Sequence, residues 1–212
     1  MKVMIAVVLI SVFLTSGAVL AEGDPTAGKN YYAVCTNCHG EAAQGNADTG
    51  APRLTHLRED YVVAQLTKFK AGIRGGEGSG PHGMQMSAIA STLPDEQAMW
   101  DVAAYIGSLE ERPPEGTIEG DVALGADYYN QYCGACHGAR AQGNPEIKGA
   151  PPPLIGANDW YLVRQLKELR RGGRGAHAED KSGRKMAVMA DVLPSEQSIY
   201  DVVAYIHSLS SE

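Results

Sequence analysis

The sequence is poor in charged residues, and positive charge is the scarcer sign. Of its 212 residues only 20% are charged, with 18 Lys and Arg against 25 Asp and Glu, which gives a net charge of −7. Such a chain lacks the basic surface that proteins use to bind nucleic acids. Its 44% of hydrophobic residues also exclude an acidic disordered tail and favour one or two compact domains.

Long apolar runs are absent after the N-terminus. There, Lys2 precedes an uncharged run over residues 3–20 that closes with Ala21. The most apolar part of this run is about a dozen residues long, shorter than the roughly 20 residues of a membrane-spanning helix. We therefore interpret residues 1–21 as a secretory signal peptide cleaved after Ala21, which leaves a mature protein without a membrane span. A retained membrane anchor is the alternative.

Cysteine is also scarce, and its four copies occur as two pairs that a histidine follows directly. The two motifs are Cys35-Thr36-Asn37-Cys38-His39 and Cys133-Gly134-Ala135-Cys136-His137. Cys-x-x-Cys-His is the attachment signature of c-type haem. One helical turn places two thiols to form thioethers with the vinyl groups of a porphyrin, while the adjacent imidazole reaches the iron. The sequence therefore predicts two covalently bound haem c groups, with His39 and His137 as iron ligands.

Three other uses of paired cysteines fit the sequence less well. A structural zinc site needs its cysteine pairs close together, and about 95 residues separate these two. A thioredoxin-like dithiol needs a βαβ setting, which the helical pattern of this chain does not provide. Disulfides within each pair leave the repeated histidine unexplained.

The chain contains the same unit twice. Residues 54–109 align with residues 154–209 without a gap, and 22 of the 56 positions are identical. The offset is 98 at the cysteine motifs. A period near 100 residues indicates two tandem domains. We predict domain 1 at 22–112 and domain 2 at 113–212, with the boundary in the proline- and glycine-containing segment 110–119.

Each half shows a helical pattern and no alternating strand pattern, so we predict an all-α fold. Apolar residues at i, i+3, i+4 and i+7 predict a last helix in each half, which Pro94 or Pro194 opens and whose first turn includes Glu96 or Glu196. Apolar residues also predict a middle helix in each half, which ends before Gly72 in domain 1 and before Gly172 in domain 2. A short leading helix is expected before each cysteine pair.

The internal repeat selects the second iron ligand. Five methionines follow the predicted signal peptide, and the alignment pairs only Met86 and Met186 with each other. His/Met is a standard axial pair in cytochromes c, so we predict Met86 and Met186 as iron ligands. Met99 and Met189 are interpreted as core filler, and neither they nor Met84 are predicted as ligands. The histidines outside the motifs lack such repeat partners and are interpreted as surface or loop residues: His56, His82, His177 and His207.

A basic pattern in the second half has two interpretations. Lys167, Arg170, Arg171 and Arg174 recur at i, i+3, i+4 and i+7, and only Arg174 has an identical counterpart in domain 1, Arg74. The pattern is typical of a solvated helix face, or it marks a surface that docks an acidic partner. The two repeated arginines are alternatively partners of haem propionates.

These features resemble the di-haem cytochrome c4 family. The resemblance rests on the paired motifs, a Pro-x-Leu segment at Pro52 and at Pro152, and a methionine seven residues before Leu93-Pro94 or Leu193-Pro194. It implies two class I cytochrome c domains related by a pseudo-twofold axis. It also implies that the carbonyls of Pro52 and Pro152 hold the Nδ1 protons of the motif histidines.

The same resemblance implies a bacterial periplasmic electron carrier, often linked to terminal oxidases. With both irons closed by His and Met, we predict a carrier and not an enzyme, serving a redox protein donor and acceptor as a monomer or small homo-oligomer. Two alternatives remain: a cytochrome subunit of a dehydrogenase, and a di-haem oxidoreductase with its own substrate, which needs an open iron position.

Overall fold

The computed structural model describes residues 22–110 and 112–211, and it is helical. The predicted signal peptide and its cleavage after Ala21 lie outside the described residues. Over the described ranges there is no β-strand, only one isolated bridge between Asn46 and Ala51. The prediction of an all-α fold is confirmed. No helix in this part of the chain is long and apolar enough to cross a membrane.

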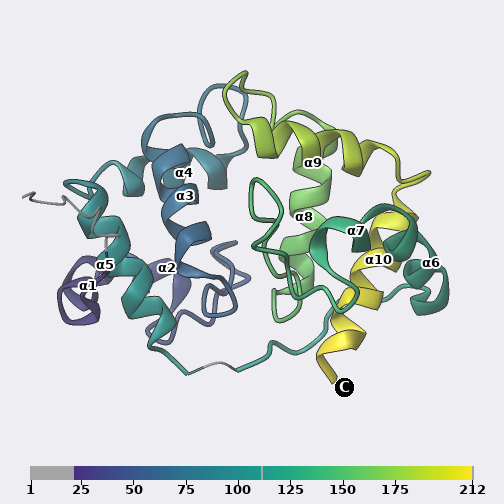
Figure 1. Cartoon of the computed structure of the whole chain (residues 1–212), viewed down its shortest axis with the longest axis horizontal. Helices are drawn as coiled ribbons and strands as arrows, with labels where there is room; N and C mark the ends of the chain where they lie inside the picture. The colour runs from purple at the N-terminus through teal and green to yellow at the C-terminus, as the bar shows by residue number, and fades with distance from the viewer. Residues whose placement is uncertain (1–21, 111, 212) are drawn as a thin grey trace, which may run out of the picture.

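The helices form two similar halves that lie side by side (Figure 1). Domain 1 contains α1 (Pro25–Tyr32), α2 (Thr36–His39), α3 (Glu59–Lys70), α4 (Pro81–Ala90) and α5 (Glu96–Gly107). Domain 2 contains α6 (Val122–Tyr132), α7 (Gly134–His137), α8 (Asp159–Arg170), α9 (Lys181–Asp191) and α10 (Gln197–Ser208), followed by a short 3₁₀ turn at Leu209–Ser211.

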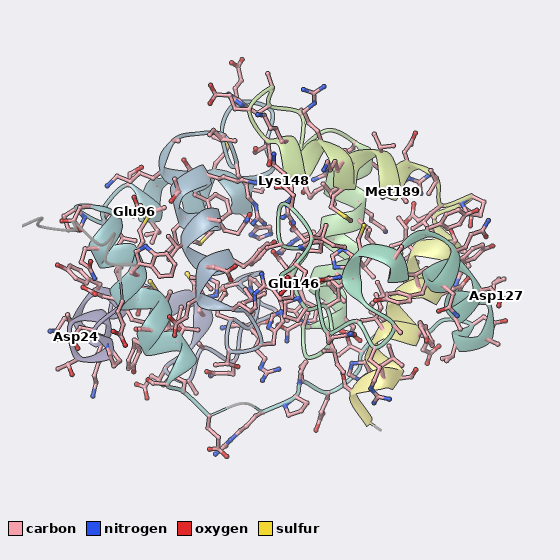
Figure 2. All side chains as sticks on the ribbon, viewed as in Figure 1. Asp24, Glu96, Asp127, Glu146, Lys148 and Met189 are labelled. Atoms are coloured by element: carbon pink, nitrogen blue, oxygen red, sulfur yellow. The ribbon has the colours of Figure 1, made fainter. Side chains whose placement is uncertain are left out.

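The first and last helices of each domain cross at a glycine. A Cβ atom on Gly28 of α1 would collide with the backbone carbonyl of Asp101 in α5, and Gly125 of α6 meets Asp201 of α10 in the same way. The Asp101 carboxylate also accepts the backbone N–H of Asp24 at 2.9 Å. These contacts lie toward the outer ends of the molecule, where Asp24 and Asp127 are found in Figure 2.

The start of the last helix differs from the sequence prediction. Pro94 precedes the N-cap Asp95, whose carboxylate accepts the backbone N–H of Ala98 at 2.9 Å, and α5 begins at Glu96. In domain 2, Ser195 and Ser198 bond reciprocally ahead of α10. The placement of the two prolines inside the first turn is therefore wrong, because the residues after them cap the helices. The middle helix does end as predicted, since Gly72 adopts φ of +70°.

Segment 112–121 joins the domains without helical structure and passes along one side of both (Figure 1). It is not a free tether. The buried carboxylate of Asp159, at the start of α8, accepts hydrogen bonds from the backbone N–H groups of Thr117 and Ile118. Burial works to raise the pKa of Asp159, but these hydrogen bonds outweigh it and hold the pKa below its usual value.

Loops of the two domains also bond directly to each other. The Arg53 backbone N–H donates to Asn158 Oδ1 at 2.7 Å, and its guanidinium donates to the carbonyl oxygen of Gly156 at 2.6 Å. His56 lies within this contact, with a buried Nδ1 atom and its Cβ beside Gly156. Burial, aided by the charge of Arg53, lowers the pKa of His56 to about 3. His56 is therefore a loop residue, as interpreted from the sequence, but it lies in the contact between the domains and not on the open surface.

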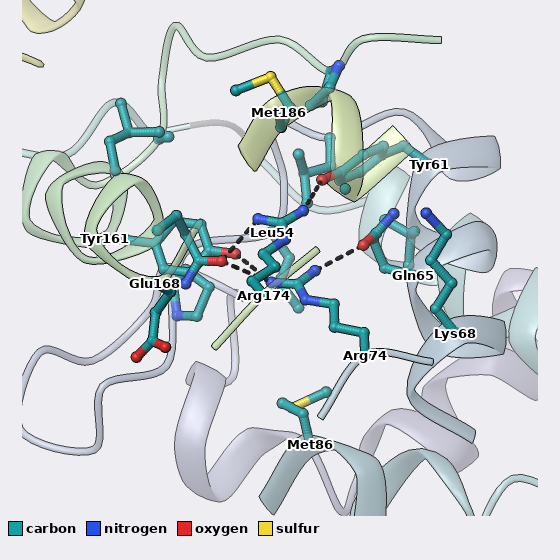
Figure 3. Close-up of a pocket in the computed structure, with 18 of the residues that line it drawn as sticks. Leu54, Tyr61, Gln65, Lys68, Arg74, Met86, Tyr161, Glu168, Arg174 and Met186 are labelled. Carbon is teal, nitrogen blue, oxygen red and sulfur yellow. Dashed lines mark hydrogen bonds between the residues drawn. The ribbon is translucent and has the colours of Figure 1, made fainter. Parts of the chain in front are cut away.

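Two arginines cross the interface reciprocally, as a pseudo-twofold axis requires (Figure 3). Arg74 donates to Gln65 of its own domain at 2.8 Å and to Tyr161 of domain 2 at 3.1 Å. Arg174 donates to Gln165 at 2.7 Å and to Tyr61 of domain 1 at 3.2 Å. Tyr61 and Gln65 are identical to Tyr161 and Gln165 at the repeat offset. This identity is the feature of the sequence that could have indicated their role.

This arrangement shows that the basic pattern predicted in the second half is not a single solvated helix face. Arg174 lies beyond the end of α8 and points into the interface, so it does not share a solvated face with the other three residues. Lys167 pairs with Glu196 and Arg171 with Glu168, and Arg170 donates to the carbonyl oxygen of Ser195 at 3.1 Å.

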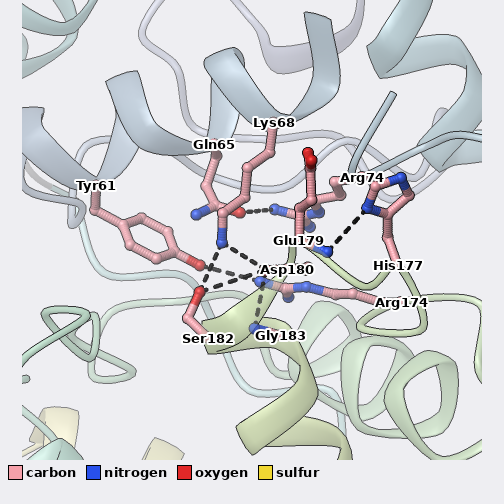
Figure 4. Close-up of polar contacts among 10 residues, drawn as sticks. All are labelled: Tyr61, Gln65, Lys68, Arg74, Arg174, His177, Glu179, Asp180, Ser182 and Gly183. Atoms are coloured by element: carbon pink, nitrogen blue, oxygen red, sulfur yellow. Dashed lines mark hydrogen bonds and ion pairs between the residues drawn. The ribbon is translucent and has the colours of Figure 1, made fainter. Parts of the chain in front are cut away.

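A buried ion pair breaks the symmetry of the interface. Lys68 of α3 lies 2.6 Å from the carboxylate of Asp180, whose side chain is 2% exposed, and also contacts Ser182 (Figure 4). Asp180 caps α9 by accepting the backbone N–H of Gly183 at 3.0 Å. Burial works to raise the pKa of Asp180, but the hydrogen bonds from Lys68 and Gly183 outweigh it and lower the pKa. The repeat places Glu168 and Gly80 at the equivalent positions, so no second copy of this pair exists.

We predict that Lys68→Met destabilises the holoprotein, because it leaves the Asp180 carboxylate buried without its main partner. A fully buried pair costs about 3–5 kcal/mol to break from one side. Lys68 is 21% exposed, so we expect a loss of about 1–2 kcal/mol in the free energy of unfolding, measured with guanidinium chloride at pH 7. Lys29→Met, on an exposed side chain of α1, is the control and should leave this free energy nearly unchanged.

The difference in the free energy of unfolding between wild type and Lys68→Met should depend on pH in one direction. A carboxyl group with a lowered pKa in the folded state stabilises the protein above its unfolded pKa, near 4, and this contribution is lost as pH falls through the folded value. We therefore expect a constant difference from pH 7 down to about pH 5 and a shrinking one below about pH 4. A difference that grew on acidification would contradict the assignment to Asp180.

Candidate haem-binding sites

Each cysteine motif forms one helical turn. In domain 1 the backbone N–H of His39 donates to the carbonyl oxygen of Cys35 at 2.8 Å, and in domain 2 His137 donates to Cys133 at 2.9 Å. Residues at i, i+3 and i+4 share one side of such a turn. Both thiols and the imidazole of a motif therefore lie on the same side.

A glycine in an unusual conformation ends each turn. Gly40 has φ of +82° and Gly138 has φ of +83°, a region that side chains with a Cβ rarely adopt. A buried tyrosine hydroxyl donates to each of these glycine carbonyls, from Tyr32 at 3.0 Å and from Tyr129 at 2.7 Å. The motif is thereby anchored to the first helix of its own domain.

The motif histidines are oriented by proline carbonyls. His39 Nδ1 lies 2.7 Å from the carbonyl oxygen of Pro52, and His137 Nδ1 lies 2.9 Å from that of Pro152. A carbonyl oxygen only accepts hydrogen bonds, so the proton of each neutral ring is on Nδ1. The lone pair is consequently on Nε2, which is the atom free to bind iron.

Both rings are kept neutral by burial. His39 and His137 are each 4% exposed, and burial lowers the pKa of both, against the opposing effect of the proline carbonyls. The Nε2 atom of His137 is buried and has no hydrogen-bond partner in the structure. A buried polar atom without a partner is costly in free energy, so this nitrogen fits a metal ion as its missing partner.

The cysteines are free thiols in differing degrees of burial. Burial raises the pKa of Cys35 and of Cys133 to about 11, with a further contribution from the second cysteine of each pair. Cys38 is half-buried and Cys136 is exposed. Cys35 and Cys133 are also half-buried, so only the motif of domain 2 has one cysteine clearly more exposed than the other, and all four line the same cavity.

That cavity has a volume of about 670 Å³ and extends through both domains. Its wall includes both cysteine motifs, both proline segments and the apolar side chains of Leu66, Val102, Leu166 and Val202. An apolar cavity with an imidazole and two thiols on one side suits a large planar porphyrin. The residues present therefore fit covalent haem in each half.

Met86 and Met186 line this cavity from α4 and α9, two helices that the sequence analysis did not predict. They lie on opposite sides of the arginine pair in Figure 3. Met84 is 57% exposed and is not part of the wall, and Met99 is buried in the core of domain 1. Met189 does belong to the wall, one turn after Met186, as Ile89 does in domain 1.

Comparison with known proteins shows which protein family has this architecture. The cytochrome c family model matches residues 25–110 and again residues 122–210. Cytochrome c4 of Azotobacter vinelandii is 31% identical over 95% of this chain and 98% of its own. The thiosulfate dehydrogenase electron acceptor of Stutzerimonas stutzeri is 34% identical over 74% of this chain and 72% of its own.

A solved structure agrees in fold. The crystal structure of reduced recombinant cytochrome c4 from Pseudomonas stutzeri superposes with a TM-score of 0.64 at 27% identity, covering 87% of this chain and 97% of that one. Cytochrome c domains bind haem covalently through the motif found here, so the two domains bind two haem c groups. The chain belongs to the cytochrome c family and, within it, to the di-haem cytochrome c4 family.

Proposed function

We propose that this protein is a periplasmic electron carrier whose two irons are bound by His39 with Met86 and by His137 with Met186. Electrons pass one at a time from a redox protein donor to an acceptor, such as a membrane terminal oxidase. The proposal is supported most directly by Met86 and Met186, which line the haem cavity from equivalent helices. With a ligand on both faces, neither iron has an open position for a substrate.

When bound, each haem supplies an iron that exchanges one electron without gaining or losing a ligand. The chain's own residues keep that site unchanged between the two states. The Pro52 and Pro152 carbonyls hold the imidazoles in place, and the apolar wall excludes water. A rigid, dry site lowers the structural rearrangement that accompanies each electron transfer.

The second candidate is a carrier dedicated to one dehydrogenase, or a subunit of it. It is favoured by the likeness to a protein named as a thiosulfate dehydrogenase electron acceptor. The positions of Met86 and Met186 do not support the alternative of a di-haem oxidoreductase with its own substrate. Purification as a free monomer or small homo-oligomer, with no dehydrogenase attached, separates a mobile carrier from a subunit.

Carbon monoxide tests whether the irons are closed. We expect the ferrous holoprotein to bind no carbon monoxide near pH 7, because His and Met already occupy both axial positions. The measurement is the absorption spectrum of the dithionite-reduced protein before and after addition of the gas. Stoichiometric binding at either haem of the native protein would instead support an enzyme.

Substitution of the methionines tests the ligand assignment. Met86→His and Met186→His should each lower the potential of one haem by a large margin, because thioether ligation favours ferrous iron. Each should also remove about half of the near-infrared methionine-to-iron absorption. The measurement is potentiometric titration together with the near-infrared spectrum of the ferric protein.

The chain offers two matched controls for this experiment. Met189→Leu changes a second methionine of the cavity wall, and Met84→Leu changes an exposed one, while both keep roughly the original bulk. Both should leave the potentials and the absorption nearly intact. If Met189→Leu abolished the signal of one haem and Met186→His did not, the ligand of domain 2 would be Met189.

Export is tested by the N-terminus of the mature protein. We expect the intact mass of the protein from the soluble periplasmic fraction to correspond to a chain that begins at Glu22, carrying two haems. Recovery of a chain beginning at Met1 in washed membranes would establish the retained anchor instead.

A further inference from the structure

Helix α9, which carries Met186, begins at a contact with the other domain. Its N-cap residue is Asp180, whose carboxylate accepts the backbone N–H of Gly183 at 3.0 Å and lies 2.6 Å from the Nζ atom of Lys68 in α3. The same Nζ atom lies 2.6 Å from the hydroxyl oxygen of Ser182 (Figure 4). A side chain of domain 1 therefore holds the first turn of a helix of domain 2.

Met186 lies close to this contact along the helix. It follows the N-cap Asp180 by six positions, and an α-helix rises about 1.5 Å per residue, so roughly 9 Å of helix axis separates the two. Ser182 and Met186 both belong to the wall of the haem cavity. Because a hydrogen-bonded helix moves as a unit, the position of its first turn also determines the position of Met186.

The polar contacts of α9 with its own domain are few. In the described part of the chain, no side chain of α9 forms a hydrogen bond to α8, the helix beside it in domain 2. Arg184 donates to the carbonyl oxygen of Ala178, in the loop before α9, at 3.4 Å. The hydrogen bonds that tie α9 to another helix therefore come from Lys68 of domain 1.

Helix α4, the equivalent helix of domain 1, is held from within its own domain. The hydroxyl of Ser87, the residue after Met86, donates to the carbonyl oxygen of Phe69 near the end of α3 at 2.7 Å. The repeat places Ala187 at this position of α9, and alanine has no hydroxyl to donate. The two methionine-bearing helices are thus held differently, α4 by its own domain and α9 by the other.

The repeat equivalent of Lys68 does not hold α4 in return. Glu168 pairs with Arg171 of its own domain. Its carboxylate lies beside Gly80, the N-cap residue of α4, where an added Cβ would be 2.9 Å from Glu168 Oε1. Gly80 has no side chain that could bond to it, and α4 has no side-chain cap. Among the described residues, the ion pair to a methionine-bearing helix therefore occurs at α9 alone.

We propose that Lys68 is a positioning residue for Met186, the iron ligand of the other domain, and that it acts through the N-cap Asp180. This inference rests on the proposed function, in which Met186 is that ligand. With its first turn held, α9 keeps the thioether of Met186 in the cavity wall. Without the contact, α9 leaves this position more often, and the iron of domain 2 is then open to another ligand.

Imidazole measures how often a methionine leaves its iron. It binds ferric iron only where the methionine is displaced, so its apparent affinity rises with the fraction of open sites. In Met86→His the haem of domain 1 is closed by two histidines, and only the haem of domain 2 binds imidazole; in Met186→His the reverse holds. The measurement is the loss of the near-infrared methionine-to-iron absorption during titration of each ferric holoprotein with imidazole.

Lys68→Met should act on the haem of the domain to which Lys68 does not belong. In the Met86→His background, we expect the imidazole affinity of domain 2 to rise about tenfold, the factor that about 1.4 kcal/mol produces. In the Met186→His background, the affinity of domain 1 should stay unchanged. Lys68→Arg should keep the affinity near that of the parent variant, because a guanidinium group can also pair with Asp180.

Ser87→Ala is the matched control from the same domain. It removes the hydrogen bond to Phe69 beside Met86, so it should raise the imidazole affinity of domain 1 about fivefold and leave domain 2 unchanged. Two variants of domain 1 would then open different haems. A general loss of stability would open both haems in each variant.

Asp180→Asn separates positioning from a direct effect of charge. Asparagine still caps a helix, so the bond to Gly183 is retained while the ion pair is lost. Lys68→Met removes a positive charge and Asp180→Asn a negative one, so direct electrostatics would act on the iron in opposite directions. Positioning predicts that both raise the imidazole affinity of domain 2, and that the double variant does so no more than Lys68→Met alone.

Three results would overturn the proposal. They are an unchanged affinity of domain 2 in both Lys68→Met and Asp180→Asn, opposite effects of these two variants, and an equal rise at both haems in Lys68→Met. A failure of the proposed ligation shows separately, in the parent variants. Met86→His or Met186→His would then keep the full near-infrared absorption before Lys68 is changed.

Discussion

The hydrogen bond from a buried imidazole to a proline carbonyl is the constraint on which each half of this protein depends. It takes the only N–H of the neutral ring, so the lone pair of His39 or His137 is directed away from the proline segment. The cysteine turn, its terminal glycine and the buried tyrosine hold the backbone that carries this ring. The apolar cavity in front of the ring is then completed by the covalent haem, which supplies core volume that the short helices of a domain of about 100 residues do not provide.

The interface between the halves combines symmetric and asymmetric contacts. The reciprocal bonds of Arg74 and Arg174 follow the internal repeat and connect the walls of the two sites. The Lys68 and Asp180 pair occurs once, and it ties α3 of domain 1 to the N-terminus of α9. Since α9 also carries Met186, its environment differs from that of α4. The two sites of a duplicated unit are in this way made chemically distinct.

The repeat and the local motifs made much of this structure predictable. Identical residues at a fixed offset selected Met86 and Met186, and apolar periodicity located the middle and last helices of each half. Helix α4 was missed because its apolar residues are spread around the helix and produce no stripe of helical period, whereas α9 has one apolar and one charged face and carried a usable signal that was overlooked. The contacts of His56 and Arg174 across the domain interface were also missed, since both half-buried side chains meet residues of the other domain. Burial between domains leaves no periodic signal in a sequence.

The central claim, that each iron is closed by one histidine and one methionine, is tested most directly by X-ray absorption at the iron edge. Extended fine structure of the holoprotein reports the ligand atoms averaged over both irons, in the ferric and in the ferrous state. The account predicts about one sulfur and five nitrogen ligands per iron, unchanged between the two states. About half a sulfur per iron, or loss of sulfur on reduction, would contradict it and show that one of the two sites is open.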